Sequence, residues 1–180
     1  MNVYILRADS DHYECLIMPF DDLFEFTRRF NGKPLKRKTV YELICTDPDS
    51  YSDPKGDFPS LIPNVPVFSR RAVAQLHDLL DGNGELLSTF VGREEYFLFN
   101  VTRVLDALDE SKSELERFDD GRVFYIDHHS FFEDKLVGSS IFKIQQVRTM
   151  DVFVTDTFVD RVHAAGLKGF WFPLVWSNES

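Results

Sequence analysis

Val65-Pro66-Val67-Phe68-Ser69 leads directly into Arg70-Arg71-Ala72-Val73-Ala74-Gln75-Leu76, and this pattern decides the fold because it occurs twice. The second copy reads Asp151-Val152-Phe153-Val154-Thr155 and continues as Asp156-Thr157-Phe158-Val159-Asp160-Arg161-Val162. In each copy a short apolar run ends at a hydroxyl residue, whose oxygen can accept hydrogen bonds from the free amides of a new helix. The chain therefore carries two strand–cap–helix units, and neither includes a catalytic group.

The rest of the chain is dominated by short apolar runs of the kind that form strands. Helices are expected after Asp21 or Asp22, over 70–80 and over 156–165, where Gly166 followed by Leu167 is typical of a left-handed helix end. Most connections are too short for parallel crossovers. The sequence predicts an α+β protein with a mainly antiparallel sheet and two or three helices. The strands are expected at residues 3–7, 13–18, 39–46, 95–105, 122–126, 140–146, 151–154 and in the tail 169–176.

A proline-rich loop divides the chain. Five of the eight prolines fall between Asp47 and Pro66, where neither a strand nor a helix can persist. We expect residues 1–62 to form an N-terminal portion and residues 63–180 to form the main domain, the two joined in one compact unit.

Composition limits the partners of the chain. Its 180 residues carry a formal net charge of −10, which argues against direct nucleic-acid binding, because that binding depends on Lys and Arg. No apolar run approaches the roughly 20 residues needed to span a bilayer, and the N-terminus lacks the features of a signal peptide. Cys15 and Cys45 lie in apolar runs and are interpreted as buried free thiols. A cytoplasmic location is expected.

The negative charge is concentrated between Asp106 and Asp134, where ten acidic residues face three basic ones. Such a window is either a solvated surface or a docking surface for a basic protein. The basic cluster Arg28–Lys38 is explained in part by the end of a helix, where cations are favourable.

One motif suggests an enzyme. Asp127, His128 and His129 follow an apolar strand and resemble the metal-binding strand end of Asp-His-His phosphoesterases. The other motifs of that family are not found, so the default interpretation is a solvated turn. No phosphate-binding glycine loop or nucleophile motif occurs, and no cofactor is expected.

A series of short segments between residues 63 and 175 resembles family 11 of the immunity proteins of bacterial polymorphic toxin systems. The segments follow one another in a fixed order: Val65-Pro66-Val67-Phe68-Ser69-x-x-Ala72, Tyr96-Phe97-Leu98-Phe99-Asn100-Val101, Asp106-Ala107-Leu108-Asp109-x-x-x-Ser113, Ile141-Phe142-Lys143-Ile144, Val152-Phe153-Val154-Thr155-Asp156-x-Phe158 and Ala165-Gly166-Leu167-x-Gly169-Phe170-x-Phe172.

The resemblance implies a protein that neutralises a cognate toxin by direct binding and catalyses no reaction. The alternative is a metal-dependent phosphoesterase using the Asp127-His128-His129 motif. For a basic toxin, the expected contacts are seven carboxylates and two aromatic anchors in the apolar tail, which also offers a homodimer surface. These residues are Asp106, Asp109, Glu110, Glu114, Glu116, Asp119, Asp120, Trp171 and Trp176.

Overall fold

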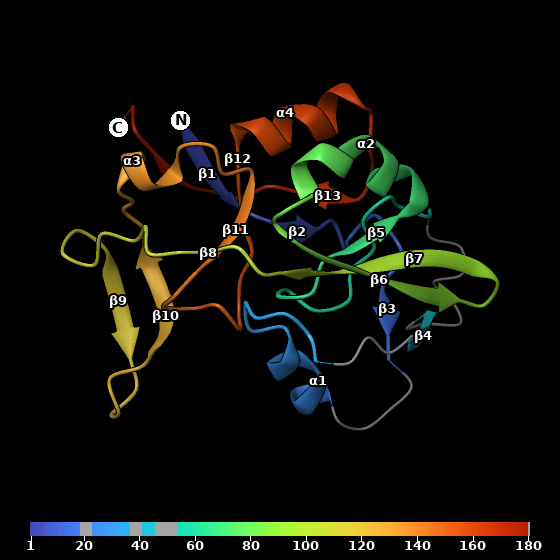
Figure 1. The fold of residues 1–180 in the computed structure, drawn as a ribbon, viewed down its shortest axis with the longest axis horizontal. Coiled ribbons are helices and arrows are strands. Elements are labelled where there is room, and N and C mark those ends of the chain that lie inside the picture. The colour runs from blue at the N-terminus through green and yellow to red at the C-terminus, as the bar shows by residue number, and fades with distance from the viewer. Residues whose placement is uncertain (19–22, 37–40, 46–53, 180) are drawn as a thin grey trace.

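The computed structural model describes residues 1–18, 23–36, 41–45 and 54–179 (Figure 1). Its elements, in chain order, are β1 (Asn2–Ile5), β2 (Arg7–Ala8), β3 (Leu16–Ile17), α1 (Leu23–Arg29), β4 (Tyr41–Cys45), β5 (Val67–Ser69), α2 (Arg70–Leu80), β6 (Gly84–Val91), β7 (Glu94–Val101), β8 (Val104–Leu105), β9 (Glu114–Arg117), β10 (Val123–His128), α3 (Glu133–Leu136), β11 (Ile141–Ile144), β12 (Phe153–Thr155), α4 (Asp156–Ala164), β13 (Phe170–Trp171) and β14 (Leu174–Ser177).

Two five-stranded sheets form the framework. One has the order β14-β1-β12-β11-β8 and the other the order β3-β4-β6-β7-β5, while β9–β10 and β2–β13 form two small two-stranded sheets. Pairing between the strands of the described ranges is antiparallel except for β8 with β11 and β4 with β6, and one isolated bridge, Cys15 with Ser60, is also parallel. The predicted α+β class with mainly antiparallel sheets is confirmed.

Strands from the first 62 residues pair with strands from the rest of the chain. β1 lies between β12 and β14, and β4 pairs with β6. The division at residue 62 stays a prediction, and most of the proline-rich loop up to residue 53 lies outside the described ranges.

The two predicted helix caps have different outcomes. Ser69 caps α2 as expected, because its Oγ accepts a hydrogen bond from the amide of Ala72 at 3.0 Å. The prediction for Thr155 is wrong: its hydroxyl makes no cap bond to α4 and instead donates to the Ser139 carbonyl at 2.8 Å. Thr155 is buried, and its hydroxyl is satisfied by this carbonyl, so it is not available to the helix end.

The two longest helices cover one part of the core. α2 and α4 lie together at the top of the molecule (Figure 1) and bury Leu76, Leu80, Phe158 and Val162. Just after α4 and its cap residue Ala165, Gly166 has a φ of 60°, and the Leu167 amide donates to the Val162 carbonyl at 3.1 Å, as the Gly166-Leu167 pair predicts.

A second cluster of buried apolar residues supports the two-stranded sheet β9–β10. Phe142 and Phe153 are fully buried and pack with Phe131, and the inward residues of the β9–β10 pair, Val123 and Ile126, close this cluster. The two-stranded sheet is therefore fixed to the main sheet through apolar contacts.

Several expected elements differ in detail. The strands β6 and β9 are absent from the predicted set, and the predicted strand 95–105 is interrupted where the amides of Thr102 and Arg103 both donate to the Asn83 carbonyl. Cys15 is half-buried and not fully buried as predicted; the side chain of Cys45 lies outside the described part.

The apolar tail forms two short strands, β13 and β14, separated by Pro173. β14 lies at the edge of its sheet, as the proline predicts. Among the described residues, no helix has the length and apolar character required to cross a membrane.

Candidate functional site

The hairpin formed by β9 and β10 is the most distinct surface feature of the molecule, and it is called here the acidic hairpin, residues 114–128. It stands at one side of the fold, away from α2 and α4 (Figure 1). Leu115 pairs with Ile126 on the inner face, whereas Glu116 pairs with Tyr125 and Glu114 with His128. Tyr125 is 53% exposed. The alternation of strand side chains therefore turns carboxylates and an aromatic ring toward solvent.

Four of the seven predicted contact carboxylates already have partners within the protein. Asp106 pairs with Lys135 at 3.4 Å, Glu110 with Arg117 at 2.6 Å and Asp120 with Arg122 at 2.7 Å. These carboxylates are therefore less available to a partner than the sequence alone suggests.

Asp109 is the fourth, and it is buried. Its carboxylate accepts hydrogen bonds from the amide and hydroxyl of Ser111 at 3.1 and 2.6 Å, and these bonds lower the pKa of the Asp109 carboxyl. Its amide donates to the Ser130 carbonyl at 2.8 Å. Asp109 fixes the turn before β9, which is a structural role.

The remaining three predicted carboxylates, Glu114, Glu116 and Asp119, are exposed on the acidic hairpin. Within the described ranges they form no ion pair. Their charge is uncompensated locally, so they are the members of the predicted set that a cation of another protein can reach.

The two predicted tryptophan anchors lie in different surroundings. Trp171 of β13 is 58% exposed and pairs in register with Arg7 of β2. Trp176 of β14 is half-buried and packs edge-on against Phe131, with 5.9 Å between ring centroids. Trp171 is available to a partner, whereas Trp176 is largely engaged in the protein's own core.

The Asp127-His128-His129 motif does not form a metal-binding cluster. Asp127 and His128 are exposed at the end of β10, and His129 is 6% exposed between the rings of Phe131 and Phe153. In the part of the chain that the structure describes, no group of three or more His, Cys, Asp or Glu side chains is arranged to hold a metal ion. His129 follows the end of β10 and packs its ring in the core, away from the exposed Asp127 and His128, so adjacency in the sequence did not bring their ligand atoms together.

Burial lowers the pKa of His129 to about 4, and the nearby Asp151 opposes this effect only in part. The unfolded chain binds a proton at this histidine near pH 6.5 and the folded chain does not, so the protein is expected to lose stability between pH 6.5 and pH 4. The loss is at most about 1.4 kcal/mol per pH unit from this group. Urea unfolding at pH 7 and pH 4.5 measures this loss. The difference in free energy of unfolding between the two pH values should be smaller in His129→Leu than in the wild type. It should be unchanged in His128→Leu, which alters the exposed neighbour. Equal effects of the two variants would contradict this assignment.

Two cavities flank the acidic hairpin. One, of about 380 Å³, lies between β10, β1 and β14 and contains the ion pair of Arg7 with Asp151 at 2.5 Å. Arg7 lines this cavity together with Tyr125, and it also lines a smaller cavity together with Trp171. The other, of about 780 Å³, lies between the hairpin, α1 and the turn after β11.

Comparison with known sequences identifies the family of the chain. No curated protein sequence matches the chain significantly. The family model of the immunity proteins Imm11 matches residues 85–175, a range that includes the acidic hairpin, Lys143 and β13 and ends within β14. Immunity proteins of this kind are typically non-enzymatic. The match covers just over half of the chain, and the protein belongs to the Imm11 immunity protein family.

Proposed function

We propose that the protein neutralises a cognate bacterial toxin domain by binding it directly in the cytoplasm. The observation that supports this most strongly is membership of the Imm11 immunity family over residues 85–175. Neutralisation by binding requires an exposed surface and no reaction, and the free carboxylates of the acidic hairpin offer such a surface.

The acidic hairpin is the proposed contact for a basic toxin. Glu114 and Glu116 lie on β9, where Glu116 pairs with the exposed Tyr125, Asp119 follows in the hairpin turn, and the whole chain carries a net charge of −10. Charge of this kind chiefly accelerates association and selects the partner, while exposed aromatic side chains such as Trp171 contribute binding free energy. A homodimer through the tail strand β14 is a further expectation.

The acidic contact is tested with a triple variant, Glu114→Gln with Glu116→Gln and Asp119→Asn, mixed with the toxin domain encoded beside its gene. We expect about a tenfold weaker affinity at low salt, mainly through slower association, and a smaller difference at high salt because salt screens exposed charges. Association rates measured by surface plasmon resonance at two salt concentrations give the answer.

The matched control neutralises three exposed carboxylates elsewhere, Asp11→Asn with Asp81→Asn and Asp160→Asn. It changes the net charge by the same amount and leaves the hairpin intact. If both triple variants slow association equally, the hairpin is not the contact and only the overall charge matters.

A further inference from the structure

The edge strand β14 has an outer side that the described residues leave open. Within the described ranges it pairs only with β1. The Ile5 amide donates to the Pro173 carbonyl at 3.0 Å, so the next pair, Tyr4 with Leu174, has no hydrogen bonds between the two strands. The amide and carbonyl of Leu174 therefore point away from β1. No described residue bonds to them, and Leu174 is 57% exposed, so another strand can reach these groups.

The two edges of the other five-stranded sheet are covered. The Ser69 amide of β5 donates to the Asp57 carbonyl at 2.9 Å, and the Leu16 amide of β3 donates to the Ser60 carbonyl at 2.7 Å. Folded proteins cover edge strands in this way because an open edge pairs readily with a strand of another chain. The open side of β14 is therefore suited to strand addition, in which the main chain of a partner supplies the hydrogen bonds.

Two cavities follow this open side. The cavity of about 380 Å³ described above is lined in part by Leu174 and Val175. A further cavity of about 670 Å³ is lined by residues 174–178, the loop after β10 and the start of α3. His128, His129, Leu174 and Val175 line both cavities, so the two are neighbours along β14. Together they are called here the edge groove.

The smaller cavity of the edge groove has an exposed apolar rim. Tyr125 of β10 is 53% exposed, Met150 is 40% exposed and Leu174 is 57% exposed, and all three line this cavity. Large apolar side chains that are exposed around one cavity favour an apolar side chain as its occupant. A strand paired with β14 presents every second side chain to the same face, so one of them can enter this cavity.

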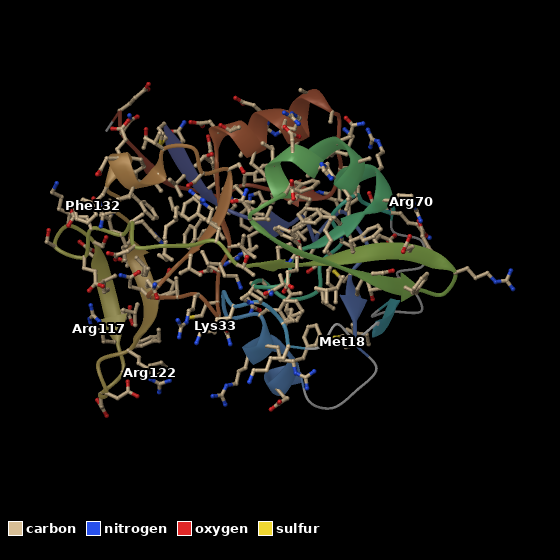
Figure 2. All side chains as sticks on the ribbon, viewed as in Figure 1. Met18, Lys33, Arg70, Arg117, Arg122 and Phe132 are labelled. Atoms are coloured by element: carbon tan, nitrogen blue, oxygen red, sulfur yellow. The ribbon has the colours of Figure 1, made fainter. Side chains whose placement is uncertain are left out.

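The uncompensated charge of the edge groove is negative. Its arginine and lysine, Arg7 and Lys112, are each paired with a carboxylate, at 2.5 and 3.5 Å. Asp127 and Glu133 also line the groove, and they form no ion pair within the described part of the chain. The two hairpin arginines labelled in Figure 2 line the cavity of about 780 Å³ instead. The groove therefore favours an occupant that carries a cation.

The homodimer expected through β14 is the alternative occupant, and it matches the groove less well. A second copy would contribute Leu174–Ser177, which contains no lysine or arginine for Asp127 and Glu133. Each copy would also bring its own two free carboxylates to the contact, and like charges oppose one another. A basic partner meets neither objection.

We propose that an extended basic segment of the cognate toxin adds a strand to β14 in the edge groove. Its backbone bonds to the amide and carbonyl of Leu174, and one apolar side chain enters the cavity between Tyr125 and Met150. A lysine or arginine of the segment pairs with Asp127 or Glu133. This rests on the proposed function. β10 lines the groove and also belongs to the acidic hairpin, so strand addition and charge attraction act on one continuous surface.

The side-chain part of this proposal is tested with Leu174→Arg, which removes an apolar rim residue and adds a charge that repels a basic segment. Val137→Arg is the matched control, because Val137 is 67% exposed and lines neither cavity of the groove. Calorimetry at about 0.15 M salt measures binding to the toxin domain encoded beside the gene, and urea unfolding checks the folding of each variant. We expect affinity to fall about 30-fold or more in Leu174→Arg and no more than about threefold in Val137→Arg.

The backbone part is tested on the wild-type protein by hydrogen exchange followed by NMR. Exchange of the Leu174 amide should slow by about tenfold or more when the toxin domain is bound, because the amide then donates to the added strand. The Ser69 amide is the control, since it is already bonded to Asp57, and its exchange should not change.

Three results would overturn strand addition while the proposed function stands. The first is equal affinity of Leu174→Arg and Val137→Arg, and the second is a Leu174 amide that exchanges equally fast in the bound and free protein. The third is a dimer of the free protein that Leu174→Arg abolishes without weakening toxin binding, because the edge then belongs to a second copy. If the wild-type protein fails to bind this toxin, the proposed function fails and the strand addition fails with it.

Discussion

Replacing Lys143 with methionine is expected to remove a rise in stability that the wild-type protein shows between pH 7 and pH 10. Lys143 lies on β11 and is completely buried, and its Nζ donates to the carbonyls of Phe30 at 2.5 Å and Asn64 at 3.2 Å. Burial lowers the pKa of Lys143 from 10.5 to about 7, and Asp151 offsets this only in part.

The direction of this change in stability follows from the number of protons that the folded and unfolded states bind. Above pH 7 the folded protein has lost the Lys143 proton, while the unfolded chain keeps it up to about pH 10.5. The unfolded state therefore binds more protons in this range, and the free energy of unfolding rises with pH by up to about 1.4 kcal/mol per unit. Over the whole range the contribution amounts to several kcal/mol, which is large compared with the typical total of about 5–15 kcal/mol.

Urea unfolding at pH 7, 8, 9 and 10 measures the effect. The difference in free energy of unfolding between wild type and Lys143→Met should increase with pH in favour of the wild type. Lys168→Met, which changes an exposed lysine, is the matched control and should follow the wild type at every pH. A difference between wild type and Lys143→Met that stays constant from pH 7 to pH 10 would contradict the burial argument.

Truncating Phe153 to alanine is expected to cost about 3–5 kcal/mol of stability. Phe153 is fully buried on β12, and its ring lies 5.8 Å from that of Phe142, 6.0 Å from that of Phe131 and 5.7 Å from that of His129. Removing the ring leaves a cavity beneath the acidic hairpin, surrounded by aromatic side chains that cannot easily collapse into it.

The control for this variant is Phe90→Ala, because Phe90 is 36% exposed at the end of β6 and its truncation should cost about 1 kcal/mol or less. Urea unfolding at pH 7 compares the two variants. A cost below about 1 kcal/mol for Phe153→Ala would mean that the second core cluster does not hold the hairpin as described.

The sequence predicted those helices and strands that depend on interactions between residues close together in the chain. The helix α2 begins after Ser69 and ends at Leu80 as expected, because an amphipathic stretch lies between a cap residue and the glycine turn. The cap prediction for Thr155 failed because of a distant contact. Its hydroxyl donates to the carbonyl of Ser139, sixteen residues away. The missed strand β9 is rich in glutamate and exists through its pairing with β10 and the packing of Leu115.

The candidate site depends even more on contacts between distant segments. The sequence indicates a continuous acidic window, but the fold pairs Asp106, Glu110 and Asp120 internally and buries Asp109. It also brings Arg117 and Arg122 of the hairpin together with Arg28 and Arg148 around one cavity. No periodicity or spacing connects these four arginines, so this cavity could not be predicted from the sequence.

The central claim is that the protein neutralises its toxin by remaining bound to it. The most direct test titrates the protein against a fixed amount of the toxin domain encoded beside its gene. Residual toxin activity and complex formation are followed in the same samples. We expect protection to become complete at a fixed molar ratio, together with a stable complex. Complete protection by a small fraction of that amount, with no complex formed, would indicate turnover and contradict the account.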